Sequence, residues 1–340
     1  MTNERINGQW RLKSRPVGMV KTTDFEYVEV PVAPLGAGEV LIRNLYLSFD
    51  PAQRGRLNDV KSYAPPQPIG EVMGAFAAGE VVESNNDAWA VGSRVVGGLG
   101  WQQYATVADG SPVMQSLRPV PDGVPPQLAL GALGGTGLTA YFGLLETGEF
   151  KAGDVVLVSG AAGATGSVVG QIARIKGARK VIGIAGGADK CAWLTNDLGF
   201  DAAIDYRNED VAARLREECG DAIDLYFDNV GGEILDAALM NMALNGRIAV
   251  CGGISQYNEA APQSGPKNYL QLIVRRLTMR GFLVSDFLAR APQAISELAG
   301  WIAAGELKHT EDIQKGIENV PQTFLRLFEG KNRGKQLLEL

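Results

Sequence analysis

The sequence has little histidine, little cysteine and no excess of positive charge. Its 340 residues include one histidine, His309, and three cysteines, Cys191, Cys219 and Cys251. Zinc sites need three or four His, Cys or carboxylate ligands at suitable spacing, and the sequence contains no Cys-x-x-Cys or His-x-x-x-His pair. We therefore expect no metal, and reduced thiols rather than a disulfide framework. His309 lies in a polar stretch, 306–312, where a surface position is expected.

The charge and hydropathy patterns exclude several classes of partner. There are 32 Lys and Arg against 38 Asp and Glu, a net charge of −6, so nothing indicates binding to nucleic acid or to an anionic membrane. No apolar run approaches the roughly 20 residues that span a bilayer. The first 16 residues are polar and lack the apolar segment of a signal peptide. A cytoplasmic protein with a small-molecule substrate is expected.

The length predicts two domains, at about 150 residues each. The first third has short β-type runs at 39–48, 80–83, 93–96 and 103–107, separated by Gly, Asn and Asp. Several short strands joined by such turns are typical of a compact, barrel-like β domain.

From residue 129 onward, strands and helices alternate. The expected strands are 154–159, 180–185, 202–205, 222–228, 247–251 and 279–284, and the expected helices are 164–176, 188–198, 211–219, 234–243 and 292–304. This alternation predicts a doubly wound α/β domain with a parallel sheet of six strands. The tail, 306–340, has no βα partner and is expected to pack on the first domain. The predicted division is 1–128 with 305–340, and 129–304.

A glycine-rich turn follows the first strand of this second domain. The stretch Gly160-Ala-Ala-Gly163-Ala-Thr-Gly166 runs from strand to helix. Gly160 and Gly163 allow a sharp turn and close approach of backbone to a pyrophosphate, and Gly166 allows the helix to pack near the sheet. Because the turn lies between a strand and a helix in a series of βα units, we interpret it as a dinucleotide-binding site.

The end of the next strand favours NADP over NAD. Enzymes that use NAD place an acidic residue there, on the ribose 2′-hydroxyl. Here the strand ends in Gly186-Gly187, and although Asp189 is near, Lys190 follows it and can neutralise a 2′-phosphate.

Without a metal, hydride transfer needs an acceptor that delocalises negative charge, such as an α,β-unsaturated carbonyl or a quinone. A tyrosine or a ribose hydroxyl can then serve as the hydrogen-bond donor. Elimination therefore points to reduction of an activated C=C bond.

Six ordered motifs carry a family resemblance that spans nearly the whole chain. They are Tyr46-Leu-Ser-Phe-Asp-Pro51 with Arg54-Gly-Arg56, Gly137–Leu144, Gly160–Gln171, Phe227-Asp-Asn-Val-Gly-Gly232, Cys251–Asn258 and Gly330–Lys335. With them the chain resembles the zinc-independent medium-chain dehydrogenase/reductases, in the branch of the prostaglandin reductases (leukotriene B4 12-hydroxydehydrogenases), plant double-bond reductases and bacterial curcumin reductases. The resemblance implies a Rossmann domain, a GroES-like β-barrel catalytic domain and NADPH-dependent reduction of 2-alkenals and 2-alkenones. It also implies a homodimer.

The resemblance assigns cofactor contacts residue by residue. Gly163, Ala164, Thr165 and Gly166 would hold the pyrophosphate, and Lys190 and Tyr206 the 2′-phosphate end. The remaining contacts would come from Asn229, Cys251, Gly252, Ile254, Ser255, Tyr257, Phe282, Leu283, Val284 and Asn332.

Two tyrosines are the candidate catalytic and substrate-binding residues. Tyr257 follows a glycine-rich strand end, where catalytic groups gather in open α/β sheets, and Tyr63 lies in a Pro-rich loop. Each could instead be a packing tyrosine. Cys251 has no base near it in sequence, so we interpret it as a small residue beside the cofactor rather than as a nucleophile.

One departure and three alternatives remain open. Many relatives carry an aromatic residue and a methionine where this chain has Ala52-Gln53, which predicts a wider or more polar substrate pocket. A quinone reductase on the same fold is the nearest rival function. A protein that binds NADPH without catalysis is the second, and a zinc alcohol dehydrogenase is the poorest.

Overall fold

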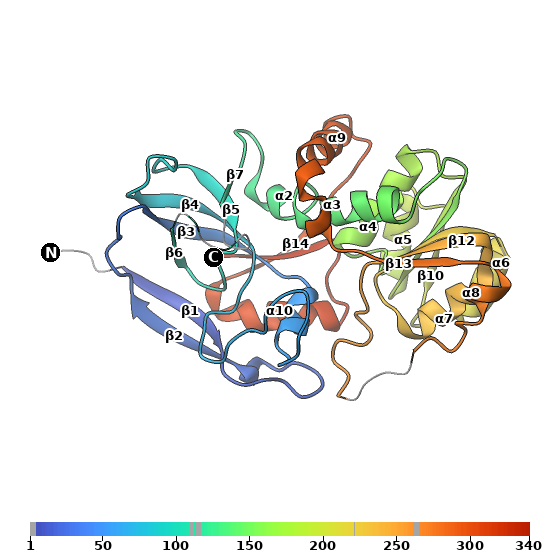
Figure 1. Ribbon diagram of the computed structural model, residues 1–340, viewed down its shortest axis with the longest axis horizontal. Helices are drawn as coiled ribbons and strands as arrows, with labels where there is room; N and C mark the ends of the chain where they lie inside the picture. The colour runs from blue at the N-terminus through green and yellow to red at the C-terminus, as the bar shows by residue number, and fades with distance from the viewer. Residues whose placement is uncertain (1–4, 109, 111, 113–116, 221, 261–264) are drawn as a thin grey trace. The chain divides into compact units, whose positions relative to one another are not determined.

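A computed structural model describes residues 5–108, 110, 112, 117–220, 222–260 and 265–340 (Figure 1). The chain divides into two compact units, Met1–Leu130 with Glu311–Leu340, and Gly131–Thr310. Within the described residues, no helix is both long and apolar enough to cross a membrane.

The first unit is built mainly from antiparallel strands. It contains β1 (Ile6–Leu12), β2 (Phe25–Pro31), β3 (Glu39–Ser48), α1 (Ala52–Arg56), β4 (Ala77–Ser84), β5 (Arg94–Gly97), β6 (Tyr104–Ala108), β7 (Arg118–Pro119), α2 (Pro126–Leu130), β14 (Glu311–Lys315), α10 (Val320–Phe328) and β15 (Lys335–Glu339). Strands β1 and β2 form a hairpin, and the larger sheet has the order β14-β15-β3-β4-β5-β7, with β6 paired to β3. The tail thus contributes two strands to this sheet, β15 beside β3 and β14 beside β15. Sequence reasoning did not predict the β1–β2 hairpin.

An aromatic cluster fills the core of this unit. The Trp101 ring is fully buried, and its centroid lies 5.2–5.4 Å from those of Phe25, Phe49 and Phe324. Because Phe324 belongs to α10, this cluster anchors the tail to the strands of the N-terminal third.

The second unit is a doubly wound α/β domain. It contains α3 (Gly135–Phe142), β8 (Val155–Ser159), α4 (Ala164–Ile175), β9 (Lys180–Ala185), α5 (Ala188–Asn196), β10 (Ala202–Asp205), α6 (Val211–Cys219), β11 (Ile223–Asp228), α7 (Gly232–Asn241), β12 (Met242–Val250), α8 (Gln271–Val274), β13 (Thr278–Gly281) and α9 (Ala291–Ala303). All six strands are parallel, in the order β10-β9-β8-β11-β12-β13, with α4 and α7 on opposite sides of the sheet (Figure 1). The predicted fold class is confirmed.

The strand order fixes where a ligand binds to such a sheet. The order reverses between β8 and β11, and ligands of open α/β sheets bind outside the carboxyl ends of the strands at that point. Strand β8 is buried along its whole length, as the unbroken apolar run Val-Val-Leu-Val predicts for a parallel strand covered on both faces.

Several of the predicted elements have other bounds in the structure. The strand expected at 279–284 ends at Gly281, and a 3₁₀ helix begins at Val284, because Phe282 leaves the sheet edge to pack its ring near Phe227 and Phe287. The helix expected at 234–243 ends at Asn241, and β12 begins at Met242 instead of 247.

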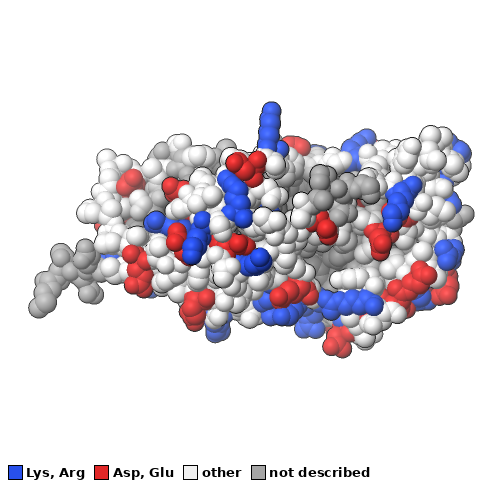
Figure 2. Space-filling model, turned by 90° about the horizontal axis from the view of Figure 1, so that it is seen from below, with Lys and Arg blue, Asp and Glu red and all other residues white. Residues whose placement is uncertain are grey.

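Charged side chains of both signs are scattered over the face drawn in Figure 2. On the face drawn in Figure 2, Lys and Arg alternate with Asp and Glu, and no broad area of one sign is visible.

Candidate functional site

The turn between β8 and α4 has the geometry of a phosphate cradle. Gly160 has a φ of +58°, a conformation that favours glycine. Gly163 is the N-cap of α4, and no side chain caps this helix end. The first N–H groups of a helix have no acceptor within it, so those of Ala164, Thr165 and Gly166 are placed to donate to an anion.

Gly166 is required by close packing. A Cβ at this position would lie 2.4 Å from the Gly160 carbonyl oxygen and 2.8 Å from the Ala161 Cα. Backbone atoms cannot yield as a flexible side chain can, so any larger residue would displace α4 from the turn. These observations meet the demands of a pyrophosphate site.

Asp228, at the carboxyl end of β11, organises the centre of the sheet edge. It is 1% exposed, and its Oδ1 accepts hydrogen bonds from the Tyr226 hydroxyl (2.7 Å) and the Ser159 hydroxyl (3.0 Å). The same oxygen accepts the N–H groups of Val230 (3.0 Å) and Gly231 (2.9 Å). Burial, followed by the nearby Asp228 charge, raises the pKa of Tyr226 well above its usual value, so the phenol stays protonated and donates.

Asn229, directly after β11, is hydrogen-bonded to the last residue of the neighbouring strand β8. Its Nδ2 donates to the Ser159 carbonyl oxygen at 2.7 Å, and its backbone N–H donates to the Ser159 hydroxyl at 3.0 Å. The turn after β11 is therefore fixed to the end of β8, immediately before the glycine-rich turn. Gly160 and Asn229 are neighbours, since a Cβ on Gly160 would lie 3.4 Å from the Asn229 Cβ.

The segment after β12 folds against the same turn. The N–H groups of Cys251 and Gly252 donate to the Asp228 carbonyl oxygen at 2.8 and 3.1 Å. Ile254 and Ser255 donate to the carbonyl oxygens of Asn229 and Val230, each at 3.3 Å. Asn229 and the predicted segment 251–257 therefore lie side by side, joined by backbone hydrogen bonds.

The hydroxyl of Tyr257 is fixed within this segment. It accepts the N–H of Gly253 at 3.1 Å, and a Cβ on Gly252 would lie 3.0 Å from it. Burial, with a smaller contribution from Asp228, raises the pKa of the Cys251 thiol to about 12, so the thiol stays protonated at neutral pH.

The proposed 2′-phosphate residues lie at the carboxyl ends of β9 and β10. Lys190 is partly buried in the first turn of α5, and Tyr206 is 45% exposed directly after β10. A Cβ on Gly186 would lie 2.9 Å from the Tyr206 hydroxyl and 2.9 Å from the Arg207 Nε. Arg207, which directly follows Tyr206 after β10, was not among the residues expected from the sequence.

The other expected site residues lie directly after β13 or in the first unit. Phe282 packs its ring against Phe227, and Leu283 is 36% exposed. In the first unit, Tyr63 is 66% exposed, and the Asn332 amide donates to the Gly334 carbonyl oxygen at 3.0 Å. Val284 opens the 3₁₀ helix that follows β13.

Gln53 does not supply a polar group to a pocket. It is buried, its Oε1 accepts the Asp50 N–H at 2.8 Å, and its Nε2 donates to the Gly74 carbonyl oxygen at 3.1 Å. Ala52 is exposed.

Among the residues that the structure describes, no group of three or more His, Cys, Asp or Glu side chains is arranged to hold a metal ion. His309 is exposed.

Comparisons with known proteins identify the family of the chain. Residues 8–115 match a family described as the N-terminal domain of oxidoreductase, and residues 164–303 match a family described as zinc-binding dehydrogenase. The NADPH-dependent curcumin reductase of Escherichia coli is 40% identical over 98% of this chain and 97% of its own. Prostaglandin reductase 1 of Bos taurus is 40% identical over 97% and 98%. The crystal structure of CurA in complex with NADPH from Vibrio vulnificus has a TM-score of 0.92 and 40% identity, and 98% of each chain is covered.

Replacing Gly166 tests the cradle. Gly166→Ala places a methyl group within 2.4 Å of the Gly160 oxygen, so we expect a loss of about 1–3 kcal/mol of stability and an increase of at least about tenfold in the Kd for NADPH, measured by fluorescence titration. The matched control is Gly300→Ala in α9, where a Cβ meets nothing within 4 Å; it should leave the Kd unchanged. Unaltered NADPH binding by Gly166→Ala would contradict the assignment.

Proposed function

The chain belongs to the medium-chain dehydrogenase/reductase family that includes the curcumin and prostaglandin reductases, and from that premise we propose that it is an NADPH-dependent reductase of the C=C bond of α,β-unsaturated aldehydes and ketones. The observation that carries the proposal is the cluster at the ends of β8, β11 and β12. There Asn229 and the segment 251–257 are bonded to one another beside the glycine-rich turn, and the Tyr257 hydroxyl has a fixed orientation.

The residues of the second unit fit the bound cofactor. The N–H groups of residues 164–166 would hold the pyrophosphate, and Asn229 with the segment 251–257 would line the nicotinamide side. Bound NADPH supplies a hydride to the substrate β-carbon. Because the Asp228 hydrogen bonds fix the turn that carries Asn229, this chain supplies a preorganised surface rather than a mobile one.

Tyr257 would stabilise the enolate that forms on the substrate. A hydroxyl that accepts an N–H bond becomes a better donor through its own proton, so the Gly253 N–H strengthens Tyr257 as a donor to the substrate oxygen. A ribose hydroxyl is the other possible donor to this oxygen. Tyr257 or water then delivers a proton to the α-carbon. In the first unit, Tyr63 is the proposed contact to the substrate, and Asn332 the proposed contact to the cofactor.

A substrate panel tests the reaction. We expect NADPH oxidation with a 2-alkenal, a phenyl-conjugated enone and a diarylheptanoid dienone, a saturated carbonyl product by mass spectrometry, and little rate with NADH or with a saturated ketone. Turnover of quinones alone would select the rival quinone reductase. Tight NADPH binding without turnover of any acceptor would select a non-catalytic binding protein.

Tyr257→Phe tests the donor. Loss of one preorganised oxyanion donor lowers kcat by about 10²–10³ in other enzymes, and the shared role of the ribose hydroxyl places the expected loss in kcat/KM at the lower end, about 10–100-fold. The Kd for NADPH should change less than about threefold, because the aromatic ring remains. Tyr27→Phe, at a 39% exposed position in the first unit, serves as the matched control. Full kcat/KM on every enone would remove Tyr257 from the mechanism.

We also propose that the protein is a cytoplasmic homodimer. The three cysteines are free thiols, which suits a reducing compartment. Strand β13 is an edge of the parallel sheet, and apolar side chains are exposed near it: Tyr269, Leu270, Ile273 and Val274 are 55–72% exposed. An exposed apolar patch beside a sheet edge favours pairing with a second copy.

Ile273→Asp tests the dimer. A charge at this 72% exposed position should shift the sedimentation mass from two chains to one, without loss of the folded structure. The control is Val91→Asp, which is 64% exposed in the first unit and should remain a dimer. A wild-type protein that sediments as a monomer at micromolar concentration would contradict the proposal.

A further inference from the structure

The carboxylate of Asp205 joins the turns that follow β9 and β10. Asp205 is the last residue of β10 and is 6% exposed. Its Oδ1 accepts the N–H of Gly187 at 2.7 Å and the N–H of Arg207 at 3.1 Å, and its Oδ2 accepts the side-chain amide of Asn208 at 2.7 Å. One side chain therefore sets the position of Gly187 relative to the segment 206–208.

These hydrogen bonds are made to an ionised group. Burial opposes the charge, but the donors on Asn208, Gly187 and Arg207, with the charge of Arg207, lower the pKa of Asp205 below its usual value. Hydrogen bonds to a carboxylate are stronger than those between neutral groups, so the two turns are firmly connected. Through these three bonds Asp205 holds the backbone of both turns.

Arg207 lies over the end of β9. Its Nε would be 2.9 Å from a Cβ built on Gly186, and its guanidinium carbon is 6.0 Å from the centre of the Tyr206 ring. The absence of a side chain at Gly186 thus makes room for both Tyr206 and Arg207. In dinucleotide-binding folds the adenosine ribose is read at the end of this second strand, and a nearby arginine can accommodate a 2′-phosphate.

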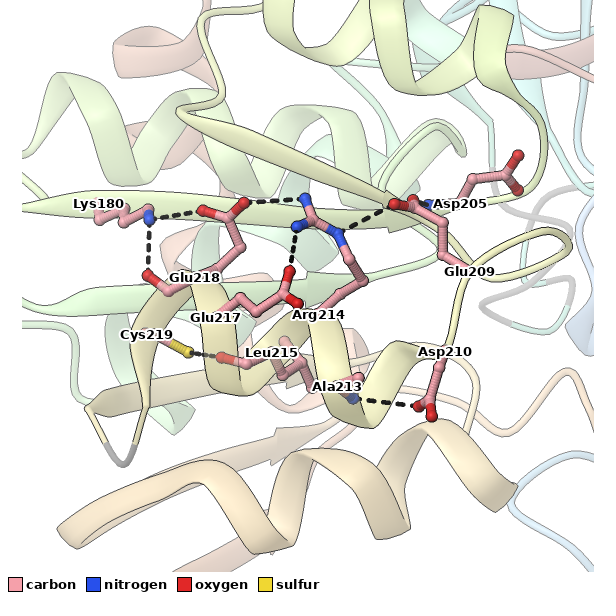
Figure 3. Close-up of polar contacts among 10 residues, drawn as sticks. All are labelled: Lys180, Asp205, Glu209, Asp210, Ala213, Arg214, Leu215, Glu217, Glu218 and Cys219. Atoms are coloured by element: carbon pink, nitrogen blue, oxygen red, sulfur yellow. Dashed lines mark hydrogen bonds and ion pairs between the residues drawn. The ribbon is translucent and has the colours of Figure 1, made fainter.

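Side chains in and just before helix α6 contact the same turn (Figure 3). Glu209 Oε2 accepts the backbone N–H of Asp205 at 2.7 Å, and Glu209 Oε1 forms an ion pair with Arg214 Nε at 3.0 Å. Arg214 also binds Glu218 at 3.0 Å, and Glu218 pairs with Lys180 at the start of β9 at 2.8 Å. The acidic side chains of this network are held by Arg214 and Lys180.

We propose that Arg207 supplies the second positive charge of the NADP 2′-phosphate site, beside Lys190, and that Asp205 is the residue that positions it. The inference rests on the proposed use of NADPH and names two residues that determine the choice between NADPH and NADH. A guanidinium presents paired N–H donors whose geometry matches two phosphate oxygens. The ammonium group of a lysine binds a phosphate as a point charge and lacks this paired geometry. Asp205 acts through the backbone of Gly187 and Arg207 and touches no phosphate itself.

Arg207→Gln tests the direct contact by equilibrium binding, without a substrate. We expect the Kd for 2′,5′-ADP and for NADPH to rise about 10–100-fold, as loss of a charge-assisted contact implies, and the Kd for 5′-AMP and for NADH to change less than about twofold. The control Arg216→Gln, an exposed arginine on α6, makes the same charge change and should alter none of the four constants. Equal losses for NADPH and NADH, or an unchanged Kd for 2′,5′-ADP, would overturn the assignment of Arg207.

Asp205 is tested by the ratio of the NADH and NADPH dissociation constants, which a general loss of stability does not change. Asp205→Ala should reduce this ratio at least about fivefold, and Asp205→Asn, which keeps an acceptor for the Gly187 and Arg207 N–H groups, should retain more of it. The control is Asp201→Asn, which alters the 2.7 Å bond to the Val181 N–H near the opposite end of the two strands and should leave the ratio intact. A ratio unchanged in Asp205→Ala would overturn the positioning role.

The binding assay separates this inference from the proposed function. A protein that reduces no enone but loses 2′,5′-ADP affinity on Arg207→Gln would refute the proposed reaction and support the phosphate site. A protein that reduces enones with NADPH while Arg207→Gln leaves 2′,5′-ADP binding unchanged would support the proposed reaction and refute the role of Arg207 in the phosphate site.

Discussion

The close approach of α4 to the Gly160 carbonyl is the constraint on which the site depends. Only glycine at position 166 permits it, since a Cβ there would overlap backbone atoms. The approach brings the uncapped start of a twelve-residue helix to the carboxyl end of β8, at the point where the strand order reverses. A helix end with unsatisfied N–H groups and a positive dipole end suits a pyrophosphate and no apolar ligand.

The remaining parts of the second unit are arranged around that turn by two buried acids. Asp228 fixes the turns after β11 and β12, and so places Asn229 and the Tyr257 segment beside the cradle. Asp205 likewise fixes the turns after β9 and β10, because it accepts the N–H groups of Gly187 and Arg207. Neither acid is proposed to take part in proton transfer. The side-chain oxygens of both acids accept hydrogen bonds from backbone N–H groups, and these bonds make the turns rigid.

Much of this architecture could be predicted because its causes are local in sequence. The glycine spacing at 160–166 and the apolar runs of the parallel strands predicted the cofactor fold, and the helix at Val211–Cys219 was predicted to the residue. Phe282 was placed in a strand because its apolar character fits a strand, whereas its actual position depends on packing near Phe227, 55 residues earlier in the chain. The same limit applies to Asp205, whose partner Gly187 lies on another turn, and to the hairpin of β1, whose alternation is hidden by polar residues.

The central claim is that hydride passes to the β-carbon of an enone, and isotopic labelling tests it most directly. A phenyl-conjugated enone would be reduced with NADPH that carries deuterium at C4 of the nicotinamide, and the product examined by NMR. The account predicts a saturated ketone with deuterium at the β-carbon and solvent hydrogen at the α-carbon. Deuterium at the carbonyl carbon of an allylic alcohol would contradict it, because the protein would then be a carbonyl reductase.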